Sequence, residues 1–262
     1  MTQPGSQPDG PDPLSRRDLL RLGAASLGVP LLAPSMKPLA AADRPAEVNA
    51  EATALSDFRP WEGENYPDHP DPRARTVNNL KFMGLAMHNF TARNGGRLPA
   101  AAIRKGDKAL LSWRVAILPW LEQNALYERF HLDEAWDSPH NAALLKEMPR
   151  VYAPVVRRDP TPYATYYQGF VGPGALFDGD EATKITDVID AAVPTLMIVE
   201  AAEPVPWTKP EDLPYDDGKP LPKLGGHFED GAYVACADGS ARFLSRRVAP
   251  ETLRALITQR RR

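Results

Sequence analysis

The segment from His131 to His140 brings two histidines and three carboxylates together within ten residues. Imidazole nitrogens and carboxylate oxygens are ligands that zinc and similar ions accept, so a metal-dependent enzyme centred on these histidines is one alternative. The same residues also fit a simpler arrangement, in which Asp137 and Ser138 cap a helix while His131 and Asp133 lie in the turn before it. We favour the capping interpretation and assign no metal ligand to the segment.

A second group of carboxylates, Asp216-Asp217-Gly218 with Asp212 upstream, could hold calcium. Calcium loops of the EF-hand type need twelve residues with a closing glutamate, and this stretch does not have that form. Aspartate and glycine are also the ordinary residues of tight turns. We therefore assign no calcium site here and keep calcium only as an alternative.

The sequence offers no nucleophile with a supporting base. It has no Gly-x-Ser-x-Gly elbow and no glycine-rich phosphate loop after a strand. The single cysteine, Cys236, stands among apolar residues typical of a buried strand, and it excludes both an intrachain disulfide and an all-cysteine metal site. His88 is interpreted as a boundary or surface residue. We expect no catalytic residue and no cofactor, and the net charge of −3 gives no sign of a nucleic-acid partner.

The main element that must position these side chains is an amphipathic helix between Arg73 and Pro99. Its apolar residues recur at intervals of three or four and share one face. They are Val77, Leu80, Met83, Met87 and Phe90. The residues Asn94-Gly95-Gly96 tolerate a left-handed backbone, so we expect the helix to end there. The stripe requires a partner surface, and the later strands are the expected one.

Shorter elements follow in the first half of the chain. Leu98-Pro99 begins an extended passage that runs to about Lys105. Leu110 to Phe130 is predicted to form two helical pieces that meet at Pro119, with Ser112 as the first cap. The helix capped by Ser138 opens with Pro139 and should turn three apolar side chains inward. These are Leu144, Leu145 and Met148.

The second half of the chain reads as strands. They are expected at Tyr163 to Val171, Val193 to Val199, Ala232 to Ala237 and Ala241 to Leu244, before a terminal helix over Pro250 to Thr258. Asp238-Gly239 lies between the last two strands and is typical of a hairpin turn, either of two residues or slightly longer. Helices followed by strands indicate an α+β fold with an antiparallel sheet and additional short helices.

The loop from Pro204 to Gly226 carries six prolines and is long for a compact domain. It could be an exposed contact surface or a loop packed on its own sheet, and we favour the second. Within it, Thr208-Lys209-Pro210-Glu211 fits a capping box for one helical turn.

The first 42 residues are interpreted as a twin-arginine signal peptide. Arg16-Arg17 precedes a short apolar run that is too broken to span a bilayer, and Ala40-Ala41-Ala42 suits cleavage before Asp43. We expect a periplasmic or secreted protein with no stable membrane span after cleavage. Residues 43–72 would then be a linker, docked through Phe58 and Trp61, and residues 259–262 a basic tail.

The motifs of residues 73–258 resemble the bacterial domain-of-unknown-function 1559 family, which is expanded in planctomycetes. The matching stretches are Asn78-Asn79-Leu80-Lys81, Gly84 to Phe90, Leu98-Pro99, Leu111 to Val115, Leu118 to Gln123, His131 to Asn141, Val205 to Pro214, Ala237 to Ser240 and Arg242-Phe243-Leu244. The resemblance implies a pseudopilin-like helix laid across an antiparallel sheet, with no established activity and no catalytic residues to carry over.

Three features depart from the family pattern. The twin-arginine signal replaces a pilin-type signal and its long hydrophobic helix, which puts assembly into a pilus-like fibre in doubt. His227 stands one position before the slot where many members have histidine, so Phe228 occupies that slot. Ile189 to Pro194 replaces a stretch that members often fill with Asp-Gly-Thr-Ser-Asn-Thr.

These observations favour an exported, non-catalytic, pilin-like domain with a structural or interaction role. Its expected partners are other exported or cell-surface proteins, and its oligomeric state is left open. A periplasmic solute-binding module is one alternative, because Tyr163 to Phe170 is aromatic and the proline-rich loop could border a pocket. A metal-dependent enzyme using His131 and His140 is the other.

Overall fold

The computed structural model describes residues 58–60, 70–156, 161–178, 182–189, 194–225 and 227–258. The chain divides into two units, Met1–Arg44 and Pro45–Arg262, and every described residue belongs to the second. The expected signal peptide, most of the expected linker and the basic tail lie outside the described residues. None of the described helices is both long enough and apolar enough to cross a bilayer.

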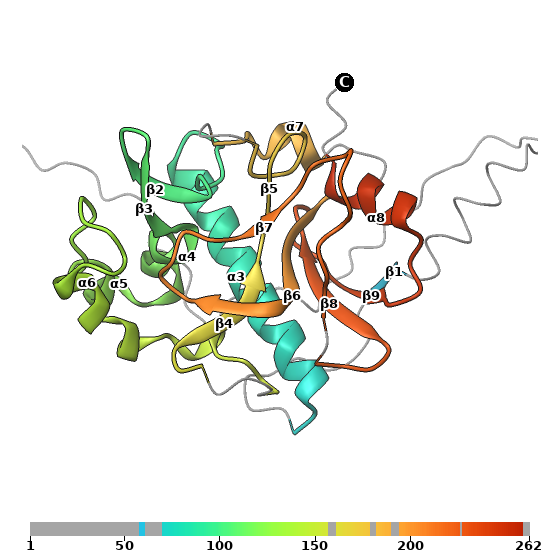
Figure 1. Ribbon diagram of the computed structural model, residues 1–262, viewed down its shortest axis with the longest axis horizontal. Helices are drawn as coiled ribbons and strands as arrows, with labels where there is room; N and C mark the ends of the chain where they lie inside the picture. The colour runs from blue at the N-terminus through green and yellow to red at the C-terminus, as the bar shows by residue number, and fades with distance from the viewer. Residues whose placement is uncertain are drawn as a thin grey trace, which may run out of the picture. The chain divides into compact units, whose positions relative to one another are not determined.

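Helix α3, Pro72–Arg93, is the longest helix described (Figure 1). Asp71 caps its start by accepting a hydrogen bond from the main-chain nitrogen of Arg73 at 2.9 Å, and Pro72 occupies the first turn. The helix ends at Asn94 and is followed by Gly95 with φ +62°. The predicted helix and its predicted end are both confirmed.

Five strands form the main sheet in the order β1-β9-β8-β6-β4, and all neighbours are antiparallel. The strands are β1 (Phe58–Pro60), β4 (Ala164–Gln168), β6 (Leu196–Pro206), β8 (Gly231–Cys236) and β9 (Ala241–Ser245). Helix α3 covers one face, and helix α8 (Pro250–Ile257) packs on the other. The predicted α+β fold, with a helix on an antiparallel sheet, is confirmed.

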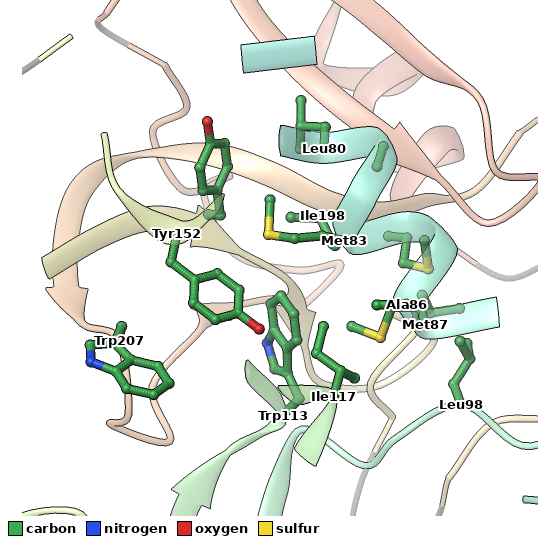
Figure 2. Close-up of a cluster of buried hydrophobic side chains, with 14 of the residues drawn as sticks. Leu80, Met83, Ala86, Met87, Leu98, Trp113, Ile117, Tyr152, Ile198 and Trp207 are labelled. Carbon is green, nitrogen blue, oxygen red and sulfur yellow. The ribbon is translucent and has the colours of Figure 1, made fainter. Parts of the chain in front are cut away.

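The larger core lies between α3 and the sheet, and Figure 2 shows part of it. The stripe residues Leu80, Met83 and Met87 are fully buried, and Trp113 and Ile198 pack in the same cluster. Burying one such side chain stabilises a fold by roughly 1.5–3 kcal/mol, so this stripe is a principal source of stability.

The prediction for Leu110 to Phe130 was partly wrong. Residues Lys108–Ser112 form strand β3, which pairs with β2 (Ala102–Lys105). Ser112 still caps a helix, because its side chain accepts from the nitrogen of Arg114 at 3.2 Å, but that helix is only α4 (Trp113–Ala116). The 3-10 helix η1 (Leu118–Leu121) and helix α5 (Asn124–Tyr127) complete the stretch. Pro119 lies in the first turn of η1, as predicted. Proline is tolerated there because the N–H that it lacks would have no partner within the helix.

Two strand predictions needed correction. Gly169 divides the predicted strand Tyr163 to Val171 into β4 and β5 (Phe170–Val171). Strand β5 pairs in parallel with β7 (Leu213–Pro214), so the sheets are not purely antiparallel. Strand β6 runs beyond Val199 to Pro206, and the first residues of the predicted proline-rich loop therefore belong to the sheet.

The other predicted elements are present. The loop between β8 and β9 is the longer form of the predicted turn: Asp238 Oδ1 accepts from the nitrogen and hydroxyl of Ser240 at 2.8 and 2.6 Å. The terminal helix α8 is confirmed. The remaining short elements are α6 (Pro139–Ala143), η2 (Leu145–Glu147), η3 (Arg150–Tyr152) and α7 (Thr186–Ile189).

The expected linker contributes to the sheet through β1. Phe58, Arg59 and Pro60 pair with Leu244, Phe243 and Arg242 of β9. This main-chain pairing places Phe58 on the sheet, and docking of the segment through the side chains of Phe58 and Trp61 stays a prediction because Trp61 lies outside the described residues.

Candidate binding site

A hollow of about 350 Å³ opens between the β2–β3 hairpin and the segment that leads into β7. Small or cyclic apolar side chains dominate its lining, which also includes three charged residues, one of them the buried Asp212. The lining residues are Ala100, Ala101, Ala102, Arg104, Ala109, Val171, Pro210, Glu211, Asp212 and Pro214. The lining residues belong to the β2–β3 hairpin and to the chain that leads into β7, and Figure 1 shows where these two elements lie.

One wall of the hollow is the open edge of β2. The nitrogen of Ser112 donates to the carbonyl of Thr208 at 3.0 Å, and so it points away from β2. Ala102, which is opposite Ser112 in the register, therefore directs its own N–H and C=O away from β3. Among the described residues, β2 has no neighbouring strand on that side.

The other wall is the outer edge of β7. The nitrogens of Leu213 and Tyr215 donate to the carbonyls of Gly169 and Val171 at 2.9 and 2.8 Å. The peptide groups of Pro214 consequently face away from β5. Proline has no N–H, so this wall can accept hydrogen bonds there but cannot donate them.

Below the second wall, Asp212 and Arg114 form a buried ion pair. Asp212 Oδ1 lies 3.0 Å from Arg114 Nη1, and the two side chains are 2% and 0% exposed. The same oxygen accepts from Trp113 Nε1 at 3.1 Å and from the nitrogen of Gly169 at 2.8 Å. Asp212 lines the hollow, although its carboxylate is almost fully buried. The ion pair therefore ties three separate segments together at one atom.

Arg114 completes the connection by donating to the chain on either side of the proline-rich turn. Its Nε donates to the carbonyl of Trp207 at 3.2 Å, and its Nη2 to that of Glu211 at 2.9 Å. The donors of a guanidinium lie in a rigid plane. The three bonds from Arg114 to Trp207, Glu211 and Asp212 therefore fix the path of residues 207–212. Desolvation raises the pKa of the Asp212 carboxyl, and the charge of Arg114 opposes that rise.

Buried aromatic side chains pack against Arg114 and the segment 207–212. Trp207 is fully buried, donates from Nε1 to the carbonyl of Leu145 at 3.0 Å, and stacks on Tyr152 with ring centroids 5.7 Å apart. The hydroxyl of Tyr152 donates to the carbonyl of Arg114 at 2.7 Å. Gly169 has to be glycine, because a Cβ there would lie 2.3 Å from Cε2 of Phe177. The wall is thus rigid rather than a free loop.

The segment His131 to His140 is organised by Asn141. The Asn141 side chain is fully buried, accepts from the nitrogen of His131 at 3.0 Å and donates to the carbonyls of His131, Glu134 and Ala135. Ser138 caps α6 as predicted, because its hydroxyl accepts from the nitrogen of Asn141 at 3.2 Å. The segment is therefore a clamped turn before a helix.

The two histidines stack face to face, with centroids 3.5 Å apart and an angle of 3° between the rings. Parallel rings hold their nitrogen lone pairs in separate planes, so these lone pairs do not converge on one ion. His131 Nδ1 lies 2.9 Å from Glu134 Oε1, and His140 Nε2 lies 2.7 Å from the carbonyl of Arg129. Within the described residues, no group of three or more potential ligands could hold a metal.

The Asp216-Asp217-Gly218 stretch forms a turn on its own protein. Asp216 Oδ1 accepts from the nitrogen of Gly218 at 3.0 Å, and Arg254 of α8 donates to the carbonyl of Lys219 at 2.6 Å. Tyr215 is buried in the core beside α8. The loop is thus packed on its own sheet, as predicted, and Asp212 lies apart from this turn in the ion pair.

The predicted capping box at Thr208 to Glu211 was wrong. No helical turn forms there, and the fully buried Thr208 hydroxyl has no hydrogen-bond partner among the described residues. Pro210 and the hydrogen bonds from Arg114 hold this stretch in a bend, which prevents the predicted turn from forming.

Cys236 is buried, as predicted, and burial raises the pKa of its thiol to about 12. His88 is half-buried on α3, as predicted for a boundary residue. Neither side chain lines the hollow.

A second buried acid, Glu200, lies under α3. It is 4% exposed, and its Oε2 accepts from the nitrogen of Tyr233 at 3.0 Å. Burial raises its pKa to about 7, against the opposing effects of that hydrogen bond and of Arg73. Arg73 is held by Asp230, whose Oδ1 lies 2.9 Å from its Nη2.

Reasoning from the sequence missed Arg114 and Glu200. Arg114 stands 98 residues from Asp212, and no local spacing relates the two. One sequence signal pointed to Arg114: it comes directly after the apolar residues Leu110, Leu111 and Trp113. A charged residue in such a buried segment is rarely found without a partner.

The comparisons with known proteins give one match. The model of the family described as "Protein of unknown function (DUF1559)" matches residues 73–184, which include α3, the β2–β3 hairpin and Arg114. No curated protein and no solved structure matches the chain. The family description gives no sign of catalysis. Residues 73–184 are therefore similar to the DUF1559 family of proteins of unknown function.

Proposed function

We propose that this protein is an exported, non-catalytic interaction domain that holds an extended peptide segment of another exported or cell-surface protein in the hollow between β2 and β7. The observation that carries the proposal is the construction of the hollow. Two strand edges border it, each with peptide groups that point away from its paired strand, and a buried ion pair keeps one of these edges in place. Strand edges bind extended peptides through main-chain hydrogen bonds.

The shape and chemistry of the lining support a peptide more than a small solute. Alanine and proline side chains leave a shallow surface that suits small side chains in an extended chain. The solute-binding alternative required a pocket lined by the aromatic residues of Tyr163 to Phe170. Tyr166, Tyr167 and Phe170 are instead buried, and none of them lines the hollow.

Export supports a partner outside the cytoplasm. Arg16-Arg17, the apolar run and Ala40-Ala41-Ala42 stand in the order of a twin-arginine signal. Replacing both arginines, Arg16→Lys and Arg17→Lys, should abolish export and leave the uncleaved chain in the cytoplasm. Export of the double variant at the normal rate would contradict this part of the proposal.

Peptide binding is tested with a display library of twelve-residue peptides panned on the purified protein. We expect binders that lose at least tenfold in affinity when Ala109→Trp fills the hollow. The matched control is Ala249→Trp, since Ala249 is exposed and does not line the hollow. Equal affinity for both variants, with unchanged folding by circular dichroism, would reject the hollow as the binding site.

A further inference from the structure

We propose that the segment bound in the hollow is residues 47–54 of a second copy of this chain, so that the protein associates with itself by strand addition. The inference rests on the proposed function and names its partner. Residues 47–54 lie outside the described residues.

The sequence of this segment fits a shallow, two-walled hollow. It reads Glu-Val-Asn-Ala-Glu-Ala-Thr-Ala, and Val48, Ala50, Ala52 and Ala54 alternate with polar residues. In an extended chain, alternate residues share one face. The apolar face would carry only side chains small enough for a surface made of alanine and proline, while the polar face would remain in water.

The charges at the rim are complementary to the segment. The β2–β3 hairpin carries Arg104, Lys105 and Lys108, all exposed, against Asp107, and Lys105 already pairs with Asp133 at 3.3 Å. Glu211, the other charged residue at the rim, is already paired with Lys209. Residues 47–54 carry two glutamates and no basic residue. Opposite charges on facing surfaces favour association and set its orientation.

The main-chain groups fit as well. The open edge of β2 offers peptide N–H and C=O groups at Ala102, and the β7 edge offers a carbonyl at Pro214 but no N–H. A strand added to β2 would therefore gain ladder hydrogen bonds on that side. On the β7 side, Pro214 has no N–H to donate, so the added strand would pair with β2 alone. Proline protects the edges of natural sheets in the same way.

The length of the chain indicates that the segment comes from another copy. Phe58 begins β1, and three residues separate it from Ala54, so the connection spans at most about 14 Å. β1 and β4 are the opposite edges of the main sheet, four strand spacings or roughly 19 Å apart, and Val171, which lines the hollow, follows β4 by three residues. Figure 1 shows β1 and the β2–β3 hairpin on opposite sides of the described body. We therefore infer that a segment bound in the hollow belongs to another copy of the chain.

Two matched double substitutions in the processed chain test the proposal by analytical ultracentrifugation. Ala50→Asp with Ala52→Asp places two charges on the face that would enter the hollow, and should weaken self-association at least tenfold. Asn49→Asp with Thr53→Asp adds the same charge to the other face, near the basic hairpin, and should leave association unchanged or stronger. A wild-type protein that stays monomeric at about 100 μM, or two variants that behave alike, would overturn the proposal.

A synthetic peptide of residues 45–57 separates this inference from the proposed function. The peptide should bind the Ala50→Asp, Ala52→Asp protein and should lose at least tenfold in affinity for the Ala109→Trp protein. If it does not bind, but library peptides still bind in a manner sensitive to Ala109→Trp, the inference fails and the proposed function stands. If neither binds, both fail.

Discussion

Two clusters of charged and aromatic residues differ in how they appear in the sequence and in what they do in the structure. His131 and Glu134 are close in sequence, and their side chains are 50% and 41% exposed. Arg114 and Asp212 are 98 residues apart, and their side chains are 0% and 2% exposed. The first cluster lies on the surface of a turn that Asn141 holds in place, whereas the second connects distant segments around a hollow.

The difference teaches that local density of reactive residue types is a weak guide to function in this fold. Short-range clusters arise wherever a turn precedes a helix, because caps and turns favour the same polar residues. A buried ion pair is costly unless its geometry is good and its other hydrogen bonds are made. The Arg114–Asp212 pair meets both conditions and is therefore the more informative feature.

The largest effect is expected when the buried pair is broken. Asp212→Asn keeps the shape of the side chain but leaves the Arg114 cation buried without a counter-charge, and should lower the free energy of unfolding by roughly 3–5 kcal/mol. Urea denaturation monitored by tryptophan fluorescence measures this. The matched control is Asp217→Asn, since that carboxylate is 81% exposed and 3.5 Å from Arg254; it should cost no more than about 1 kcal/mol. Equal losses would contradict the comparison.

A second prediction concerns Glu200, a buried carboxylate with no guanidinium in hydrogen-bond contact among the described residues. Its pKa is about 7 in the folded protein, above the ordinary 4.5, so the folded state binds the proton more tightly. Its contribution to stability is therefore full below pH 4.5 and falls as the pH rises toward 7. The integrated loss is roughly 3 kcal/mol.

Glu200→Gln should remove this dependence, because the neutral amide can still accept from the nitrogen of Tyr233. Urea unfolding at a series of pH values should show the variant equal to the wild type near pH 4 and more stable at pH 8. A difference that does not change with pH would show that the carboxyl titrates normally.

The smallest effects are expected in the His131 to His140 segment, where Asn141 and the histidines should differ in their contribution to stability. Asn141→Ala removes four hydrogen bonds from a fully buried side chain and should cost roughly 2–3 kcal/mol. His131→Ala removes a half-exposed ring and should cost no more than about 1 kcal/mol. Thermal unfolding of the two variants measures the difference, and the reverse order would assign the histidines the structural role.

Much of the fold was predictable because its signals are local. The stripe of α3, the glycines after Arg93 and the Asp238-Gly239 turn each determine an element within a few residues. Strand β3 was not predictable, since its apolar residues run directly into those of α4. Its strand state depends on pairing with β2 and on the contact with Thr208, which is distant in sequence.

Less of the candidate site was predictable. The proline-rich loop was identified as packed on its own sheet, but the partner of Asp212 was not found. Pairing between Arg114 and Asp212 requires that α4, β5 and the loop before β7 meet, and the sequence carries no periodicity that reports such a meeting. The hollow is a product of tertiary packing, as its lining comes from four separate stretches of the chain.

The central claim is that the buried ion pair, rather than the histidine segment, keeps the wall of the hollow in place. Amide hydrogen exchange on the wild type and on Asp212→Asn tests it most directly. We expect the amides of Leu213 and Tyr215, which donate to Gly169 and Val171, to exchange at least tenfold faster in the variant after correction for global stability. Unchanged protection at both amides would contradict the account.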